Sequence, residues 1–273
     1  MYSFLRFPNF RTKALTLSYD DGVVFDERLM QICNENGLKC TFNLNSGGYG
    51  SGRRLSLDAA VALYKNSRHE VAVHGAWHFS LAEVPKIAGM WDILADRRAH
   101  EETYGCIVRG MAYGNGSYND EAVETLKACG IVYGRTTKST ESFAIPTDWL
   151  RLEPTCHHAN PRLQELLDEF LEDKPVRYAH QMRPKLFYLW GHSYEFNDAN
   201  TWDVIENFAK KVGNREDVWY ATNIEVYDYV KAFDSLIFNV NCTRVKNPTS
   251  TDLWICVQGK DIFVPAGAEV ETN

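Results

Sequence analysis

The chain has 273 residues, of which 45% are hydrophobic, 24% charged and 13% aromatic, and this composition excludes intrinsic disorder and fibrous architecture. Its 29 Lys and Arg against 36 Asp and Glu leave a formal net charge of -7, and no basic run forms a stripe for phosphates. We therefore expect no nucleic-acid partner. No uncharged apolar run approaches the roughly 18 residues of a membrane span, so no span is expected.

The N-terminal residues and the cysteines bear on the compartment. Residues 1–13 lack the apolar core of a signal peptide, and no two of the seven cysteines form a C-x-x-C pair. Reduced thiols in the cytoplasm are therefore expected. Export with a signal peptide already removed is the alternative, and no sequence feature indicates an oligomeric state.

Short apolar runs alternate with amphipathic stretches from residue 14 onward, which is typical of βα units around a mostly parallel sheet. Strands are expected at residues 14–19, 41–44, 70–73, 106–108 and 186–190. Helices are expected to begin near Asp26, Ser56 or Asp58, Pro85, Asn119, Pro161 and Thr201, with a last one at 224–233. The helix after Pro85 carries one apolar stripe, formed by Ile87, Met90, Trp91 and Leu94.

The pattern changes near residue 234. The segments SLIFNVN, DLWICVQ and DIFVPAG alternate like strands and are separated by Asn-Pro and Gly-Lys turn signals. The sequence therefore predicts an α/β protein, with a (β/α) barrel over residues 1–233 and a small antiparallel β appendage over residues 234–273.

Acidic and histidine residues directly follow three of the expected strands. The first strand ends in Asp20-Asp21-Gly22, the strand at 70–73 is followed by His74 with His78 four residues on, and the strand at 186–190 leads to His192. Because the working groups of such barrels lie at the carboxyl ends of the strands, these side chains are expected to meet at one rim.

His74 and His78 have the i, i+4 spacing that places two imidazoles on one face of a helical turn, a common way to offer two nitrogens to one metal. A carboxylate from Asp20 or Asp21 would complete a three-ligand site with an open position for catalysis. The alternatives are one exposed and one packed histidine, and a solvated turn at Asp-Asp-Gly.

Neighbouring residues of a strand point to opposite faces, so Asp20 and Asp21 can serve one site only if the chain turns there, which Gly22 makes easy. One carboxylate would then bind the metal, and the other would take a proton from the attacking water. His192 is expected to act as a general acid, with a buried structural histidine as the alternative.

The remaining histidines have simpler interpretations. His157 and His158 lie in an expected loop and are either surface residues or substrate contacts. No site role is assigned to His69, His100 and His180.

These blocks resemble the polysaccharide deacetylases of carbohydrate esterase family four. SYDDG at 18–22, HGAWH at 74–78 and LWGH at 189–192 match the family's T-F-D-D-G, H-[ST]-x-x-H and Leu-x-His blocks, and GSYND at 116–120 matches the segment after its third block. The resemblance covers roughly residues 12–232. It implies a distorted (β/α) barrel, a divalent metal, usually zinc with Co²⁺, Ni²⁺ or Mn²⁺ as alternatives, and removal of an N-acetyl or O-acetyl group from a saccharide.

The resemblance also implies roles for individual residues. It implies a general base at Asp20, metal ligands at Asp21, His74 and His78, and a general acid at His192 that protonates the departing amine. The backbone N–H of Asn115 would stabilise the oxyanion. Substrate contacts are expected from Tyr113, Trp149 and Trp190, and support of His192 from Asp148.

The third block departs from the family pattern. Ala112-Tyr113-Gly114-Asn115 stands where the family has Arg-x-Pro-aromatic, so neither the arginine nor the proline is matched, and Arg109 is out of register. Gly75-Ala76 also lacks the hydroxyl residue that follows the first histidine. A variant branch of the family is the closer match, and the residue that orients the base is not identified.

Three functions are compatible with these residues. The first is a metal-dependent deacetylase of an acetylated saccharide. The second is a hydrolase of a small non-sugar amide on the same fold, and the third is a saccharide-binding protein that retains the metal without turnover. Aromatic residues such as Trp77, Trp190 and Tyr194 could stack on sugar rings in either saccharide case.

Overall fold

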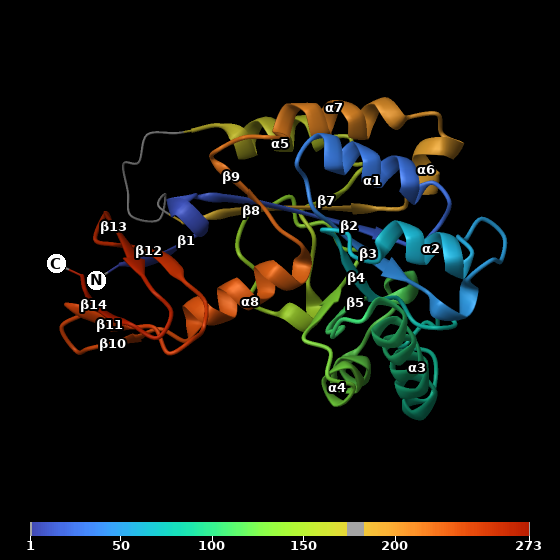
Figure 1. Ribbon diagram of the computed structural model, residues 1–273, viewed down its shortest axis with the longest axis horizontal. Coiled ribbons are helices and arrows are strands. Elements are labelled where there is room, and N and C mark those ends of the chain that lie inside the picture. Colours follow the sequence, from blue (N-terminus) through green and yellow to red (C-terminus); the bar gives the residue numbers. More distant parts are fainter. Residues whose placement is uncertain (1, 174–182, 273) are drawn as a thin grey trace.

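An eight-stranded parallel sheet forms the centre of the protein, which is described at residues 2–173 and 183–272 by a computed structural model (Figure 1). The strand order is β6-β5-β4-β3-β2-β8-β7, and β9 pairs with the start of β2 off this path. The strands are β2 (Lys13–Asp20), β3 (Cys40–Leu44), β4 (Glu70–Val73), β5 (Gly110–Ala112), β6 (Tyr133–Arg135), β7 (Cys156–His157), β8 (Lys185–Gly191) and β9 (Val218–Tyr220). The sheet curls into an incomplete barrel with edges at β6 and β7, which confirms the predicted α/β class and distorted barrel.

Helices cover the sheet on both sides. In Figure 1, α1, α5 and α7 lie along the upper side of the sheet, and α3, α4 and α8 lie below it. The helices are α1 (Asp26–Glu35), α2 (Leu57–Tyr64), α3 (Lys86–Tyr104), α4 (Asp120–Ala128), α5 (Leu163–Leu171), α6 (Ser193–Asp198), α7 (Trp202–Val212) and α8 (Asn223–Asp234). Two expected caps are confirmed, since Ser56 accepts a hydrogen bond from Ala59 N and Asn119 accepts one from Ala122 N.

One expected strand is wrong and several short elements were missed. Residues 106–108 form no strand, and Ile107 is 77% exposed; the strand of this region is β5, whose Met111 pairs with Val73 of β4. No pattern predicted β6, β7, β9 or α6. The three strands have two or three residues and α6 has six, so a strand or a helical period, respectively, is too short to be recognised.

The two faces of β2 differ in character. Leu15, Leu17 and Tyr19 belong to the main apolar core, as their expected common face requires. The alternate residues face polar partners: Asn43 Nδ2 donates to Ser18 Oγ and to Asp20 Oδ1, each at 2.8 Å. The interior of the barrel is therefore polar at the end where β2 delivers Asp20.

Helix α3 is oriented opposite to the expectation. Ile87 is 74% and Trp91 64% exposed, whereas Asp92, Asp96 and His100 are fully buried. Three of the four residues of the expected stripe, Ile87, Trp91 and Leu94, are therefore exposed, and only Met90 packs against an apolar cluster. Trp91 stacks on Trp77 with ring centroids 4.8 Å apart. The acidic side chains are turned inward because they hold the loops of the candidate site, as described below.

The C-terminal residues form two small antiparallel sheets. One has the order β10-β11-β14, and the other has the order β1-β12-β13, so that it includes the N-terminal strand. Figure 1 shows both sheets beside the end of α8, near both chain ends. Their strands are β1 (Ser3–Arg6), β10 (Ile237–Phe238), β11 (Arg244–Lys246), β12 (Leu253–Val257), β13 (Lys260–Val264) and β14 (Glu269–Glu271). The boundary between a barrel domain at residues 1–233 and a β appendage at residues 234–273 stays a prediction.

Two further observations concern the whole chain. All seven cysteines are free thiols. Among the described helices, none combines the length and the apolar character that crossing a membrane requires.

Candidate metal centre

Titratable side chains from three strands meet in one cavity at the carboxyl edge of the sheet. Asp20 ends β2, His74 follows β4, and His192 follows β8. The cavity has a volume of about 250 Å³ and is lined by Asp20, Asp21, His74, His78, Tyr113, Asn115, Gly116, Thr137, Trp190, His192 and Tyr194. Larger cavities exist, of about 350 and 610 Å³, but this one collects the acids and histidines that follow the strands.

Asp21, His74 and His78 form a group that could hold a metal ion. Asp21 Oδ1 lies 4.0 Å from Nε2 of each histidine, and the two Nε2 atoms lie 3.1 Å apart. Atoms bound about 2.1 Å from one cation stand roughly 3 to 4 Å apart, so this spacing fits three ligands of one ion. Two histidines and one carboxylate leave a coordination position open.

The backbone turns at Asp21, and this turn is what allows the neighbouring residues Asp20 and Asp21 to face the same cavity. Asp21 itself has φ 81° and Gly22 has φ 64°, both in the left-handed region. This turn brings the Asp21 carboxylate to the same cavity as that of Asp20, and Arg54 Nη2 lies 3.3 Å from Asp21 Oδ1.

The two histidines are presented by an irregular loop, so the expected helical turn is wrong. Gly75 has φ 84° and His78 has φ 57°, and His78 N donates to Gly75 O at 3.3 Å. His74 Nδ1 lies 2.9 Å from the carbonyl oxygen of Ala112, which can only accept, so Nδ1 carries the proton and Nε2 offers a lone pair to the cavity. Burial and the neighbouring His74 lower the pKa of His78, which favours the neutral form that binds metals.

Buried acids of α3 fix this loop. Asp96 accepts hydrogen bonds from His74 N at 3.0 Å and from Ser46 N at 2.7 Å, and Asp92 accepts one from Trp77 N at 2.7 Å. A Cβ on Gly75 would come within 2.3 Å of Asp92 Oδ2, so the loop also needs a glycine there. This arrangement explains why α3 turns its polar face inward.

Asp20 is held as an ionised carboxylate. Its Oδ1 accepts from Asn43, and its Oδ2 pairs with Arg135 Nη2 and lies 3.8 Å from His74 Nε2. Burial alone would raise the pKa of Asp20, but the positive charge and the hydrogen bond of Arg135, together with the charge of His192, outweigh it and lower the pKa to about 2. This carboxylate is therefore available as a proton acceptor.

Arg135 is a site residue that the sequence did not reveal. It is fully buried, and its guanidinium carbon lies 4.3 Å from the centre of the Trp190 ring. In the β5–β6 ladder, Arg135 is the direct partner of Ala112, which occupies the position of the family arginine. The positive charge that the family pattern places at position 112 is therefore supplied by Arg135 from the adjacent strand.

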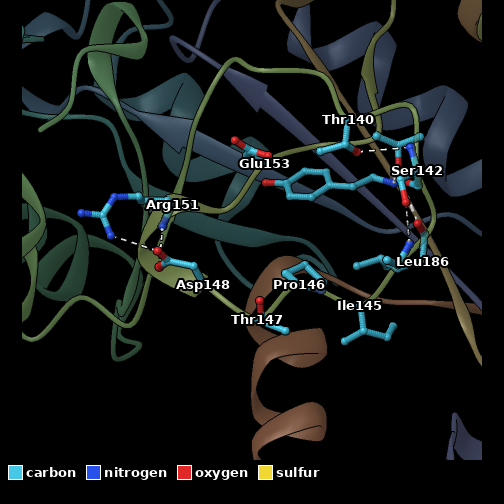
Figure 2. A pocket seen from close by; sticks show the side chains of 12 residues that line it. Thr140, Ser142, Ile145, Pro146, Thr147, Asp148, Arg151, Glu153 and Leu186 are labelled. Carbon is cyan, nitrogen blue, oxygen red and sulfur yellow. Dashed lines mark hydrogen bonds and ion pairs between the residues drawn. The ribbon is translucent and has the colours of Figure 1, made fainter.

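His192 lies opposite the two histidines of the loop. Its Nε2 is 3.9 Å from Asp20 Oδ2, and its Nδ1 is 3.4 Å from Glu195 Oε1. Burial lowers the pKa of His192, but Glu195 and Asp20 outweigh this effect and raise it. The expected supporting residue was Asp148, which instead caps a turn and binds Arg151 at 2.9 Å in a separate cavity (Figure 2).

The remaining expected site residues divide between two places. Tyr113, Asn115 and Trp190 line the cavity, and the Trp190 Nε1 is buried without a hydrogen-bond partner. The Tyr113 hydroxyl is used elsewhere, since it donates to Leu150 O at 2.8 Å. Trp149 does not line this cavity; it packs edge-on against Tyr227 and borders another cavity next to β1.

The other histidines are also placed. His157 and His158 pair with Glu195, each at 3.1 Å, and these residues line the cavity of about 610 Å³ and not that of the metal centre. His69 accepts from Cys40 N, and His100 is buried 3.3 Å from Asp96 Oδ1. His180 lies outside the described residues.

Comparison with known proteins links this geometry to one family. Residues 8–134 match a family model described as polysaccharide deacetylase, a range that includes the Asp21, His74 and His78 group and ends before Arg135 and His192. No curated protein sequence matches the chain.

Solved structures share the fold. A protein from Mycobacterium smegmatis with a provisional polysaccharide deacetylase name has a TM-score of 0.62 at 16% identity, covering 85% of this chain and 95% of its own. The peptidoglycan deacetylase PdaC of Bacillus subtilis, as a mutant, has a TM-score of 0.55 at 13% identity, covering 84% and 96%. A mutant of a family 4 carbohydrate esterase pseudoenzyme from Bacillus anthracis, with restored enzymatic activity, has a TM-score of 0.50 at 17% identity, covering 82% and 70%.

Proposed function

Because residues 8–134 belong to the polysaccharide deacetylase family, we propose that the protein is a divalent-metal-dependent hydrolase that removes an N-linked or O-linked acetyl group from a saccharide. The observation that carries this proposal is the convergence of Asp21, His74 and His78 on one point, with Asp20 and His192 beside it in the same cavity. A ligand group with an open position, flanked by a base and an acid, suits hydrolysis by activated water.

Asp21, His74 and His78 would hold the cation. The fit is supported by the tautomer of His74, whose Nδ1–H donates to Ala112 O and leaves Nε2 free. When bound, a divalent ion supplies Lewis acidity to the acetyl carbonyl and lowers the pKa of water in the site. Zinc is proposed first, with Co²⁺, Ni²⁺ and Mn²⁺ as alternatives, because nitrogen and carboxylate donors accept all four.

Asp20 would take the proton of the attacking water at Oδ2. Arg135 and Asn43 fix the orientation of its carboxylate, and Arg135 keeps it ionised. The role requires Asp20 to stay off the cation, which is consistent with its use of both oxygens in contacts with these two residues.

His192 would deliver a proton from Nε2 to the departing nitrogen or oxygen. An amine leaves an acyl carbon only when it is protonated, so this step is essential for an N-acetyl substrate. The backbone N–H of Asn115 would stabilise the oxyanion, and Tyr113 and Trp190 would line the acetyl pocket.

The test is acetate release from a panel of acetylated saccharides, including N-acetylated chito-oligosaccharides and O-acetylated xylo-oligosaccharides. We expect release that is lost after chelation and restored by Zn²⁺, or by one of the alternative ions. Protein that binds the ion but liberates no acetate from any member of the panel would contradict the proposal. Hydrolysis of small amides without acetate would favour the amide hydrolase, and sugar binding without turnover the silent binding protein.

The assignment of the two aspartates has a separate test. Asp21→Ala is expected to abolish stoichiometric Zn²⁺ binding in calorimetry, because it removes the only carboxylate ligand of the proposed set. Asp20→Asn is expected to retain metal binding and to lower kcat by about a hundredfold or more, since it removes the base. Equal loss of metal in both variants would contradict these roles.

A further inference from the structure

Three histidines surround the carboxylate of Glu195 behind the proposed acid. Glu195 Oε2 lies 3.1 Å from His157 Nε2 and 3.1 Å from His158 Nε2, and it accepts from His192 N at 3.2 Å. Its other oxygen, Oε1, lies 3.4 Å from His192 Nδ1. Glu195, His157 and His158 lie outside the ligand group and have no role in the mechanism described so far.

The hydrogen bonds fix where the protons are. Ala159 N donates to His157 Nδ1 at 3.1 Å, so Nδ1 is an acceptor and the ring proton is on Nε2, directed at Glu195. The backbone N–H of His192 also donates to this carboxylate. Several donors around one carboxylate favour its ionised form, because an ionised carboxylate only accepts hydrogen bonds. Burial would raise the pKa of Glu195, but the hydrogen bonds from the histidines outweigh it and lower the pKa.

The positions of the ring protons also argue against a metal ion bound by His157, His158 and Glu195. A histidine that binds a metal through Nε2 donates its Nδ1–H to an acceptor. His157 Nδ1 instead receives a hydrogen bond, and His158 Nδ1 is buried without a partner. The cluster is therefore organised to hold a carboxylate.

The fold places Glu195 with respect to His192. His192 is the residue before the first turn of α6, and Glu195 is the third residue of that helix, so its side chain reaches back to the N–H of His192. Gly191 is needed for this packing, because a Cβ there would come within 2.1 Å of His158 Nδ1. The ring of His192 is thus held with Nδ1 toward Glu195 and Nε2 toward Asp20.

We propose that Glu195 is the positioning residue of the general acid His192, and that His157 and His158 hold Glu195 in place for this task. The inference rests on the proposed function. In this structure the Nδ1 atom of His192 is buried without a hydrogen-bond partner, and Glu195 Oε1 lies 3.4 Å from it. In the proposed complex with substrate this distance shortens, and Glu195 Oε1 accepts a hydrogen bond from the Nδ1–H of His192, as catalytic hydrogen bonds commonly tighten on binding. As the carbon–nitrogen bond breaks, its electron pair stays on nitrogen, which takes the proton from Nε2. His192 is left neutral with its proton on Nδ1.

The test compares leaving groups. Glu195→Gln keeps the side-chain length and the cap of α6, but it weakens the acceptor for Nδ1–H. On an N-acetylated oligosaccharide we expect kcat to fall about a hundredfold with KM little changed. On 4-nitrophenyl acetate, whose leaving group departs without a proton, we expect a change of about twofold or less.

A matched control separates positioning from helix capping. Glu225 occupies the same third position in α8, accepts from Thr222 N at 2.8 Å and does not line the cavity. Glu225→Gln should leave both substrates unaffected. An equal loss on both substrates in Glu195→Gln, or no loss on either, would overturn the inference.

A spectroscopic readout keeps the inference testable if the wild-type protein releases no acetate, an outcome that would count against the proposed function alone. In ¹⁵N spectra of the histidine rings, assigned with His192→Gln, the His192 Nδ1 should be protonated in the wild type. The Glu195→Gln variant should shift this proton toward Nε2. A wild-type His192 with unprotonated Nδ1, or a spectrum that the substitution leaves unchanged, would overturn the inference.

Discussion

Arg135 shows how one residue can be replaced from a neighbouring strand. The family pattern leads to Ala112, which carries no charge, and the guanidinium that holds Asp20 comes from the residue paired with Ala112 across the ladder. The distance between adjacent strands is about 4.8 Å, which a long side chain readily spans. A missing motif residue is therefore not a missing function when the sheet brings the same group to the same carboxylate.

Removal of this guanidinium should impair both activity and stability. Arg135→Met leaves the Asp20 carboxylate buried with weaker partners, which costs about 3–5 kcal/mol for a broken buried pair. We expect acetate release to fall about a hundredfold, because the base is no longer oriented. Adding Asp20→Asn to Arg135→Met should recover part of the stability in urea unfolding, but none of the activity. A double variant no more stable than Arg135→Met would contradict a direct coupling of the two residues.

At this scale the sequence predicted the residues at the ends of strands with a recognisable apolar pattern and missed those on the shortest elements. Asp20 ends β2, and His74 and His192 directly follow β4 and β8. Arg135 lies in a strand of three residues and Glu195 in a helix of six, where periodicity carries no signal. A cheap signal for Glu195 did exist, namely a glutamate three residues after an expected strand-end histidine, as in a capping box.

At the scale of the element, α3 is the clearest failure of pattern reasoning and the reason lies in the site. Apolar spacing favours burial of Ile87 and Trp91, but burial of Asp92 and Asp96 satisfies backbone N–H groups of the two loops that carry and flank the ligands. Those N–H groups would otherwise be buried without partners, at about 1–3 kcal/mol each. Tertiary hydrogen bonding therefore overrides amphipathic spacing here.

The link between α3 and the ligands predicts an effect on metal affinity. Asp96→Asn replaces one of two acceptor oxygens with an NH₂ group, which opposes the N–H of Ser46 or of His74. We expect the dissociation constant for Zn²⁺ to rise about 10–100-fold, as is typical when support of a ligand is removed. Calorimetric titration measures it. Glu102→Gln, at an exposed position of the same helix, is the control and should bind Zn²⁺ as the wild type does.

At the scale of the whole molecule, the β-rich C-terminal residues are integrated with the barrel through α8. Leu253, Ile255 and Val257 of β12 share one apolar cluster with Val226 and Val230 of α8. The Tyr229 hydroxyl donates to Arg6 O at 2.8 Å and accepts from Trp254 N at 3.2 Å, so one side chain joins α8, β1 and β12. The sequence predicted the β character of this region but not the participation of β1, because strand pairing at such separation leaves no local pattern.

Tyr229→Phe should therefore lower stability without touching the site. The substitution removes the hydrogen bonds that Arg6 O and Trp254 N make to the Tyr229 hydroxyl, and we expect a loss of about 1–3 kcal/mol in urea unfolding. Metal binding should be unchanged. Tyr2→Phe, at a residue that is 61% exposed, is the control and should be neutral. A neutral Tyr229→Phe variant would argue that α8 and the two strands are held by apolar packing alone.

The pairing of β1 with β12 has a consequence for biosynthesis. Nearly the entire polypeptide must emerge from the ribosome between these two strands, so a nascent chain carries β1 without its ladder partner throughout elongation. With only four residues, β1 offers other nascent chains a short edge to pair with. Completion of this sheet is therefore a late event, reached after all residues of the candidate metal centre have been translated.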